Sequence, residues 1–322
     1  MTNDQSISIG GHEIELSNLD KTFFPESGIT KGDLIDYYER IAATALPHYR
    51  DRPLSMQRFP DGIAKDGFFQ KDLPDYFPDW VDRVRLKKEG GSVTYAVANN
   101  AATLVYIANQ GCITPHLSLA RRDKPEHPDR LVIDLDPSTS DFGKVVFAAR
   151  RVKQLLDELD LTSFVQTTGS RGLHVVVALD RSANFDQARR FARSFVGLLA
   201  TRHPQTLTIE QRKSKRGEAV FLDYMRNAYG QTAVAPYAAR ALENAPVATP
   251  LDWSELDSDG LNPQKYTVGN IFRRLGQKDD PWAGIERHGQ SLAQAASALD
   301  ALSRDQTAAA AGSQSRDKKT GK

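Results

Sequence analysis

The sequence has one cysteine, almost no net charge and no long hydrophobic run, and each of these features argues against a class of protein. The single cysteine, Cys112, cannot form an internal disulfide or build a thiolate metal site. No apolar run approaches the ~20 residues of a membrane helix, and the first residues lack the pattern of a signal peptide. Lys and Arg total 42 against 41 Asp and Glu, so net charge alone does not indicate nucleic acid. We expect a soluble protein of the reducing cytoplasm, with no membrane partner.

Length and composition allow one large domain or two smaller ones, each with its own core. The chain has 322 residues, of which 40% are apolar and 26% charged, an ordinary balance for a globular protein. We expect an N-terminal subdomain over residues 1–120 and a core with a C-terminal wrap over residues 121–302. The polar residues 1–12 are expected to fray. Residues 303–322 have the composition of a segment that cannot form a core, so a disordered tail is predicted.

Apolar spacing in the first subdomain predicts a mixture of helices and strands. Apolar residues recur at three- and four-residue steps from Thr30 to Tyr49, which predicts a helix. Thr30 can cap this helix, because Asp33 follows three residues later as a partial capping box. The further elements that we expect are the strands Leu54–Phe59, Val84–Leu86, Val93–Val97 and Ile113–Leu119 and the helix Asn99–Gln110.

The second subdomain has the clearest pattern, which reads β-α-β-β-α-β. The expected elements are the strand Leu131–Pro137, the helix Phe142–Leu159, the strands Ser163–Thr167 and Leu173–Val177, the helix Phe185–Arg202, and a last strand at Leu207–Glu210 or Ala219–Asp223. This order is the split-βαβ plan of ferredoxin-like and RNA-recognition folds. In that plan the first and third strands lie side by side at the centre of the sheet. Asp134 and Asp136 would then neighbour His174.

Asp134 and Asp136 are candidate metal ligands. Residues two apart on a strand project to the same face, and two carboxylates held this close repel each other. A divalent cation between them removes that repulsion, and oxygen-only ligands suit Mg²⁺ or Mn²⁺. Asp223, at the end of a second apolar strand, would complete a set of three. Taken alone, the Asp134–Asp136 pair is better explained by turn formers that end a strand, and Asp223 by a cap at the end of a strand.

Two polar segments would suit a polyphosphate. The turn between Thr167 and His174 has two glycines that expose backbone N–H groups, and it carries hydroxyls at Thr168 and Ser170 and charge at Arg171. The segment Arg212–Arg216 has four basic residues in five. An ordinary hairpin turn and a solvated loop remain the alternatives. Three aspartates around two cations about 3.5–4 Å apart is the geometry of nucleotidyl transfer, although a hydrolase could use the same carboxylates.

These motifs carry a resemblance to a known family. From about Asn18 to Gly284, the sequence resembles the polymerase module of bacterial DNA ligase D, within the archaeo-eukaryotic primase superfamily. The motifs are Arg52-Pro53, Phe68-Phe69-Gln70-Lys71, Asp134-Leu135-Asp136-Pro137, the Gly169–His174 turn, Phe221–Tyr224, Arg226-Asn227, Gly230–Tyr237 and Asp280-Pro281-Trp282. The chain departs from the family at the turn, where Ser-Gly-Gly-Lys-Gly is frequent, but it keeps a hydroxyl and a cation.

The resemblance implies a fold and a set of site residues. The fold is α+β, an archaeo-eukaryotic primase fold with an RNA-recognition-like βαββαβ catalytic core plus an N-terminal α/β subdomain. The implied catalytic metal ligands are Asp134, Asp136 and Asp223, which would hold two divalent cations, Mn²⁺ or Mg²⁺. The implied nucleotide-binding residues are His116, Thr168, Ser170, Arg171, His174, Arg216 and Arg240. The implied DNA-binding residues are Lys21, Lys31, Arg52, Phe68, Phe69 and Lys71.

Two pairs among the DNA-binding residues have specific implied roles. Lys21 and Lys31 match a pocket for the 5′-phosphate at the far side of a gap; as bare residues they are two exposed lysines. Phe68 and Phe69 match aromatics that stack on template bases; without the family, two core phenylalanines explain them equally well. His116 alone would be a loop or core histidine.

The resemblance further implies a template-dependent primase-polymerase that adds nucleotides, preferably ribonucleotides, at short gaps or double-strand breaks. Its partners would be gapped or broken DNA with a 5′-phosphate, nucleoside triphosphates, Ku and a separate DNA ligase. We expect a free-standing monomer at the bacterial nucleoid, because no ligase-like lysine motif is found. End joining and excision-repair gap filling both remain open. The alternatives are a non-catalytic DNA-end or gap-binding protein and a metal-dependent phosphoesterase.

Overall fold

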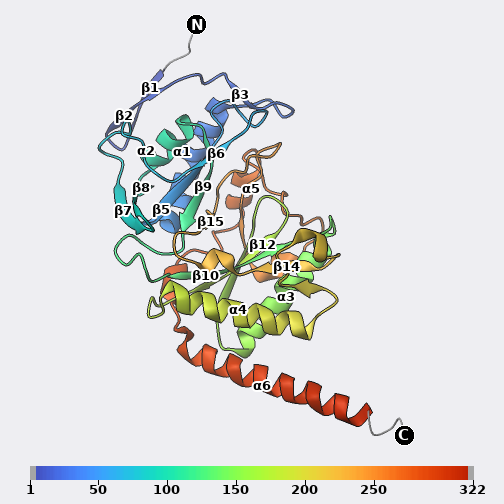
Figure 1. The fold of residues 1–322 in the computed structure, drawn as a ribbon. Helices are drawn as coiled ribbons and strands as arrows, with labels where there is room; N and C mark the ends of the chain where they lie inside the picture. Colours follow the sequence, from blue (N-terminus) through green and yellow to red (C-terminus); the bar gives the residue numbers. More distant parts are fainter. Residues whose placement is uncertain (1–4, 318–322) are drawn as a thin grey trace.

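Two six-stranded sheets organise the structure, one in each of two lobes (Figure 1). The structure is a computed structural model that describes residues 5–317, with the backbone alone over residues 307–317. The first lobe contains α1 (Lys31–Tyr49), β5 (Pro53–Arg58), β6 (Phe68–Gln70), β7 (Arg83–Lys88), β8 (Gly91–Val97), α2 (Ala101–Asn109) and β9 (Cys112–Ser118). Its sheet has the order β15-β9-β5-β8-β7, with β6 on β5, and β15 (Thr232–Val234) joins it from far along the chain.

The second lobe has the predicted split-βαβ order. It contains β10 (Arg130–Asp136), α3 (Phe142–Glu158), β11 (Ser163–Thr167), β12 (Leu173–Ala178), α4 (Phe185–Arg202), β13 (Leu207–Thr208), β14 (Val220–Asp223) and β16 (Pro250–Leu251). The strand order is β13-β14-β10-β12-β11-β16, so the first and third strands of the motif are neighbours at the centre. Each of the two segments proposed for the last strand contains a strand, β13 and β14, and these two strands pair in parallel. The expected α+β fold with a βαββαβ core is confirmed.

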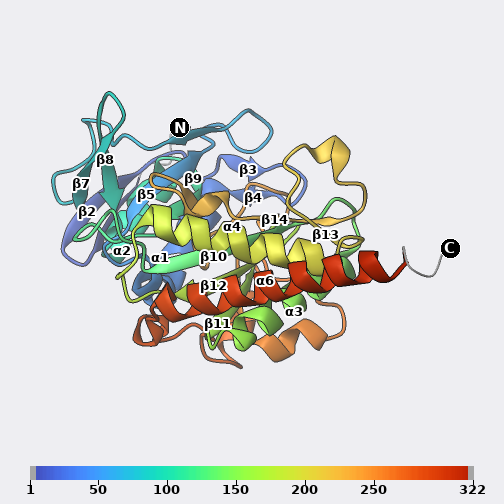
Figure 2. The ribbon, with the colours of Figure 1, turned by 60° about the horizontal axis from the view of Figure 1, so that its bottom comes forward.

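The sheet of the second lobe has one apolar face and one mixed face. Leu131, Ile133 and Leu135 of β10 are buried with α3 and α4 in one core, as the alternation predicted. Helix α6 (Leu292–Asp317) packs along α4 beyond that layer (Figure 2). The intervening residues, Val132 and the two aspartates after it, face the other way. The face that carries the aspartates is therefore the face without these helices.

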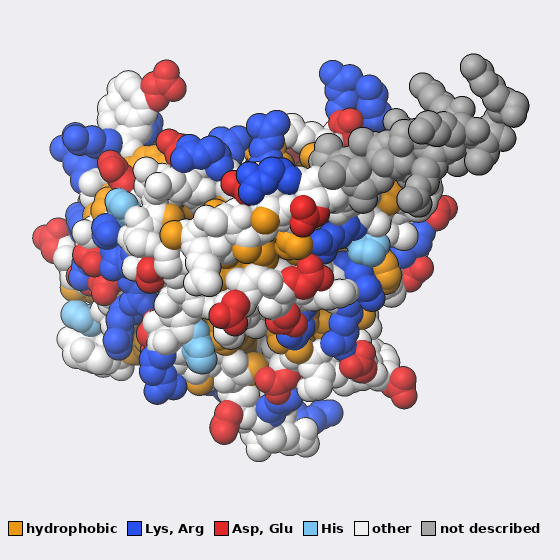
Figure 3. Space-filling view, turned by 90° about the horizontal axis from the view of Figure 1, so that it is seen from below, with side chains coloured by type: hydrophobic (Ala, Val, Ile, Leu, Met, Phe, Trp, Pro, Cys, Tyr) orange, Lys and Arg blue, Asp and Glu red, His pale blue; other side chains and the backbone are white. Residues whose placement is uncertain are grey.

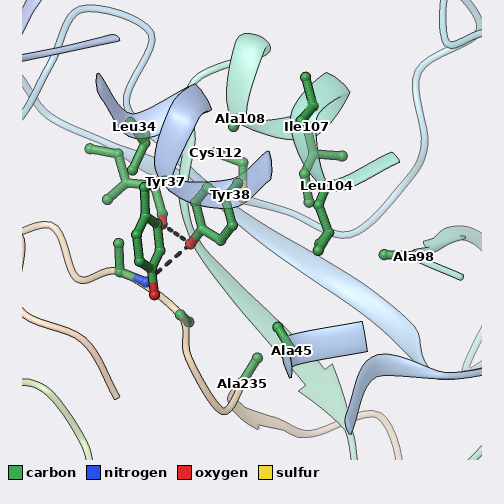
Figure 4. Close-up of a cluster of buried hydrophobic side chains, with 14 of the residues drawn as sticks. Leu34, Tyr37, Tyr38, Ala45, Ala98, Leu104, Ile107, Ala108, Cys112 and Ala235 are labelled. Carbon is green, nitrogen blue, oxygen red and sulfur yellow. Dashed lines mark hydrogen bonds between the residues drawn. The ribbon is translucent and has the colours of Figure 1, made fainter. Parts of the chain in front are cut away.

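The first lobe has its own core around α1. Thr30 caps α1 and forms the predicted capping box with Asp33. Tyr38 is buried, and its hydroxyl donates to the carbonyl oxygen of Ile113 at 2.7 Å and accepts from the backbone N–H of Ala239 at 3.1 Å (Figure 4). Because Ala239 follows β14 of the second lobe in the chain, a segment that returns from that lobe completes the first core.

The two ends of the chain are more regular than the sequence predicted. Residues 5–16 form the hairpin β1 (Gln5–Ile9) and β2 (His12–Leu16) instead of fraying, because Ile14 and Leu16 are buried in the first core. Helix α6 continues to Asp317, where a disordered tail from residue 303 was predicted. Alanine-rich sequence favours helix even where it cannot build a core. Residues 318–322 of the predicted tail lie outside the described residues.

The surface and the helices agree with the balanced composition. Among residues 5–317, no helix combines the length and the apolar character needed to cross a bilayer. Basic and acidic side chains are interspersed on the face seen from below (Figure 3). On this face, any preference for nucleic acid must therefore come from local clusters of charge.

Arg52 joins the two lobes and is not available to DNA, which corrects the role expected for it. The side chain is 1% exposed and forms a bidentate pair with Asp129 at 2.7 Å, and it also donates to the carbonyl oxygens of His48 and Ser118. Asp129 directly precedes β10. The ion pair therefore connects the start of β5 to the start of the central strand of the other sheet.

We predict that Arg52→Met lowers the free energy of unfolding by about 3–5 kcal/mol, because it leaves a buried carboxylate without its main partner. Urea denaturation at pH 7 measures the change. The control is Arg122→Met, since Arg122 is more exposed and pairs with Asp51 and Asp82 near the surface; it should cost at most about 1 kcal/mol. Equal effects of the two substitutions would contradict the assignment.

Asp129 should also make the stability depend on pH. Burial alone raises its pKa, but Arg52 and Arg130 outweigh burial and lower it to about 2. Because the unfolded chain has a pKa of about 3.9, the carboxylate stabilises the fold above pH 4, and this contribution disappears as the pH falls through 2. The difference in unfolding free energy between the unchanged protein and Asp129→Asn should shrink by roughly 1–2 kcal/mol below pH 4. A difference that stays constant down to the lowest pH at which both fold would refute this.

Candidate active site

Three aspartates lie on neighbouring strands at one point of the second sheet. Asp134 of β10 lies directly opposite His174 of β12 on one side and Asp223 of β14 on the other. Asp136 is two residues further along β10, opposite Phe221. The side chains of Asp134 and Asp223 are 16% and 18% exposed, and that of Asp136 is 36% exposed. The acids that the sequence separates by almost ninety residues are thus brought together by strand pairing.

A pocket of about 380 Å³ opens over these carboxylates. Its walls come from both lobes, because β9 and β15 of the first sheet lie beside β10 and β12 at the lobe boundary (Figure 1). All the residues expected to bind metal or nucleotide line it, namely His116, Asp134, Asp136, Thr168, Ser170, Arg171, His174, Arg216, Asp223 and Arg240. The structure therefore gathers the predicted set in one cavity, while their individual roles remain predictions.

The turn between β11 and β12 forms one wall of the pocket. Gly169 has a φ of +65°, and at Gly172 an added Cβ would lie 2.0 Å from the carbonyl oxygen of Leu135. The glycines therefore let the turn pack flush against the end of β10. The Thr168 hydroxyl is used inside the turn, where it accepts from the N–H groups of Ser170 and Gly172. The more exposed Ser170 and Arg171 are better placed to meet a ligand.

Guanidinium groups surround the carboxylates. Arg171 donates to one oxygen of Asp136 at 3.0 Å and Arg216 to the other at 3.4 Å. Arg216 also donates to the backbone oxygen of Glu210. Arg240 donates to the carbonyl oxygen of Thr168. The cavity can thus offer several positive groups to an anion while its floor carries negative charge.

Arg226 belongs to this ring and was not assigned a role from the sequence. Its Nε lies 3.6 Å from an oxygen of Asp134 and 4.0 Å from one of Asp223. The next residue, Asn227, is buried and exchanges two hydrogen bonds with the backbone of Val132, which anchors this loop to β10. The sequence signal for Arg226 was the Arg226-Asn227 motif, three residues after Asp223. Only the pairing of the strands shows that the Arg226 side chain lies over the aspartates.

The charges inside the pocket shift the protonation of its groups. Burial and the charge of Asp134 raise the pKa of Asp223. Burial also raises that of Asp134, but His174, Arg226 and Arg240 outweigh it and leave its pKa below the usual range. Burial, together with Arg240 and Arg226, lowers the pKa of His116, so this imidazole is neutral at pH 7. The site holds an ionised acid beside one that resists ionisation, a combination that an added cation would relieve.

The donor set has the chemistry of a hard-cation site, although its side chains are turned toward arginines. Within the part of the chain that the structure describes, no three acidic, His or Cys side chains converge closely enough to hold a metal as they stand. Asp136 faces Arg171 and Arg216 instead. The carboxylates are nevertheless adjacent and supply only oxygen, which suits Mg²⁺ or Mn²⁺. Holding a cation requires them to exchange arginine contacts for metal contacts.

The two phenylalanines expected to stack on bases are at the surface. Phe68 is 47% exposed and Phe69 is 58% exposed, which argues against a pair of core residues. The ring of Phe69 meets His116 edge-on at 5.2 Å between centroids, so β6 reaches the edge of the carboxylate pocket. Lys71 follows on the same segment and donates to the carbonyl oxygen of Gly230.

Lys21 and Lys31 line a second pocket, of about 200 Å³. Lys21 is partly exposed and pairs with Asp61. Lys31 is only 5% exposed, and its ammonium group donates to the carbonyl oxygen of Ser17 at 2.6 Å. The description of both as exposed lysines is therefore wrong for Lys31, while their expected proximity is found.

Comparison with known proteins gives one family. The family model described as "LigD, primase-polymerase domain" matches residues 30–282. The chain is 32% identical over 276 residues to the multifunctional non-homologous end joining protein LigD of Mycolicibacterium smegmatis, covering 85% of this chain and 36% of that protein. It is 31% identical over 280 residues to the bifunctional protein LigD of Bacillus subtilis, covering 86% and 45%. The chain thus spans less than half the length of these relatives.

A solved structure agrees with this match. The polymerase domain from Mycobacterium tuberculosis ligase D in complex with DNA superposes with a TM-score of 0.81 at 30% sequence identity. The similarity covers 86% of this chain and 99% of that one. The structural comparison therefore agrees with the sequence comparison.

Proposed function

The chain belongs to the LigD primase-polymerase domain family, and from this premise we propose that it is a template-dependent primase-polymerase acting in DNA repair. It adds nucleotides, preferably ribonucleotides, to primer ends at short gaps or double-strand breaks. The observation that carries the proposal is the row formed by Asp223, Asp134 and His174 across three paired strands, beneath a cavity ringed by arginines.

The cavity places arginines on its walls and carboxylates on its floor, an arrangement that suits phosphoryl transfer. Arg171, Arg216 and Arg240 can bind the triphosphate and stabilise the charge on the leaving pyrophosphate. His116 and His174 would orient the nucleotide from opposite lobes, with His116 neutral. Most of the catalytic effect comes from holding a 3′-hydroxyl and an α-phosphate in line.

Two divalent cations, Mn²⁺ or Mg²⁺, are the proposed cofactors, and Asp134, Asp136 and Asp223 would hold them. When bound, such a pair lowers the barrier by stabilising the attacking and leaving oxygens. Arg171 and Arg216, which pair with Asp136 in this structure, would then be free to bind the phosphates. This exchange links binding of the cations to binding of the nucleotide.

The DNA would lie across the first lobe. Phe68 and Phe69 would stack on template bases, at ~1–3 kcal/mol per base, and Lys71 would contact the backbone near them. The pocket of Lys21 and Lys31 would take the 5′-phosphate at the far side of the gap. Ku and a separate DNA ligase are proposed partners, in end joining or in gap filling.

We predict that Asp134→Asn and Asp223→Asn each lower primer extension by at least 10²-fold, because each removes a ligand and a charge from the site. The assay uses a gapped template with a 5′-phosphate, all ribo- or deoxynucleoside triphosphates, and Mg²⁺ or Mn²⁺; Mn²⁺ and ribonucleotides should be used best. Asp157→Asn, on the exposed side of α3, is the control that should keep full activity.

The same assay separates the competing functions. Binding of the gapped DNA without extension would indicate a non-catalytic end-binding protein. Metal-dependent shortening of the strand would indicate a phosphoesterase. Extension that survives in Asp134→Asn would remove the carboxylates from the mechanism.

We also predict that Lys21→Gln reduces the preference for a 5′-phosphate over a 5′-hydroxyl at the gap by about 3- to 10-fold, because a phosphate loses one positive partner. Lys21 is the better target, since Lys31 is buried and its loss could disturb the fold. Paired binding measurements on the two DNA ends test this, with Lys65→Gln as a matched surface control. An unchanged preference would exclude Lys21 from phosphate recognition.

A further inference from the structure

The three most exposed large hydrophobic side chains in the described part of the chain lie close together in sequence. They are Tyr76, at 59%, Phe69, at 58%, and Phe68, at 47%. Large exposed aromatics gathered on one surface indicate a binding site. The two phenylalanines have a proposed role on template bases, whereas Tyr76 has none.

Arg58 connects Tyr76 to the phenylalanines. Arg58 pairs with Phe68 across β5 and β6, and its guanidinium carbon lies 5.6 Å from the centre of the Phe68 ring. Its Nη1 donates to the Tyr76 hydroxyl at 3.1 Å and to Oε1 of Gln70 at 2.6 Å. Its Nε donates to the carbonyl oxygen of Gln110 at 2.8 Å. The guanidinium is therefore held in one orientation and fixes the tip of Tyr76.

The ring of Tyr76 packs against the buried ring of Phe77 and is itself exposed. It lies 5.3 Å from the ring of Phe77, which is buried and contacts Tyr106 edge-on. A large ring held in place in this way loses little conformational entropy when a ligand stacks on it. An exposed tyrosine that only served Arg58 would not need this second support.

Phe68, Phe69, Tyr76 and Arg58 form an aromatic platform that reaches both pockets of the site. Arg58 lines the lysine pocket together with Lys21 and Lys31, while Phe69 at the other end of the platform contacts His116 of the carboxylate pocket. Phe69, Phe68 and Arg58 thus form a chain of contacts from one pocket to the other, along which a single strand could lie. Tyr76 extends this surface by one more aromatic ring.

We propose that Tyr76, fixed by Arg58, is a further stacking residue for single-stranded DNA and receives an unpaired template base on the side of the gap nearer the downstream duplex. The ligand class is a nucleobase face, which any of the four bases supplies. The inference rests on the proposed function in taking gapped DNA as the ligand. It adds a position to the path of the template that the two phenylalanines do not provide.

The test measures binding of gapped DNA by fluorescence anisotropy without nucleotides or divalent cations, so that no synthesis contributes. Tyr76→Ala should weaken binding about 5- to 100-fold, the equivalent of ~1–3 kcal/mol for one stacked base. Tyr76→Phe keeps the ring and loses the hydroxyl, and it should bind within about threefold of the unchanged protein. Tyr229→Ala removes a partly exposed tyrosine outside the platform and should have no effect.

A second measurement locates the base. DNA carrying 2-aminopurine at each unpaired template position in turn should show one position whose quenching by the protein is lost in Tyr76→Ala and kept in Tyr76→Phe. The salt dependence of binding should stay the same in Tyr76→Ala, because no phosphate contact is removed.

Two results would overturn the proposal. The first is unchanged affinity and unchanged quenching in Tyr76→Ala. The second is an equal loss of affinity in Tyr76→Ala and Tyr76→Phe, which would make Tyr76 only a hydrogen-bond partner of Arg58. Failure of the proposed function would look different. A protein that extends no primer but loses DNA affinity and one quenched position in Tyr76→Ala would keep this inference and discard the polymerase.

Discussion

The register of β10 between β12 and β14 is the constraint on which the site depends. Leu131, Ile133 and Leu135 must face α3 and α4, and a shift by one residue would move the aspartates into that apolar layer. Burial of the leucines and isoleucine therefore fixes the direction of the acids. The same register sets Asp134 opposite both His174 and Asp223. Packing energy on one face of the sheet thus positions the charge on the other.

The negative charge of the three aspartates has to be balanced, and arginine side chains balance it. The carboxylates of Asp134, Asp136 and Asp223 lie beside four guanidinium groups, which offset their negative charge. The arginines come from loops and turns, whereas the acids come from strands. Strands therefore hold the anionic floor of the pocket, while loops and turns supply its cationic walls.

The two lobes depend on contacts behind this site. Asp129 and Arg130 begin β10, and the pair of Arg52 and Asp129 ties that point to the first sheet. Trp282 is 1% exposed and donates to the carbonyl oxygen of Val165, so the C-terminal segment closes the same junction. Since the pocket takes its walls from both lobes, these buried contacts set the distance between the groups of one lobe and those of the other.

The sequence by itself determined the regular elements and the identity of the polar set, because periodicity and short motifs are local. The strand Leu131–Pro137, the two amphipathic helices of the second lobe, the capped helix after Thr30 and the turn before His174 all follow from spacing. Only the tertiary structure decided which polar residues are free to act. The resemblance implied that Arg52 contacts DNA, but its side chain is buried in an ion pair. Arg226 had no expected role and lies over the acids, and Tyr76 acquires its orientation from Arg58. The reason is physical: burial and charge pairing arise from segments far apart in the chain, so no local pattern can reveal them.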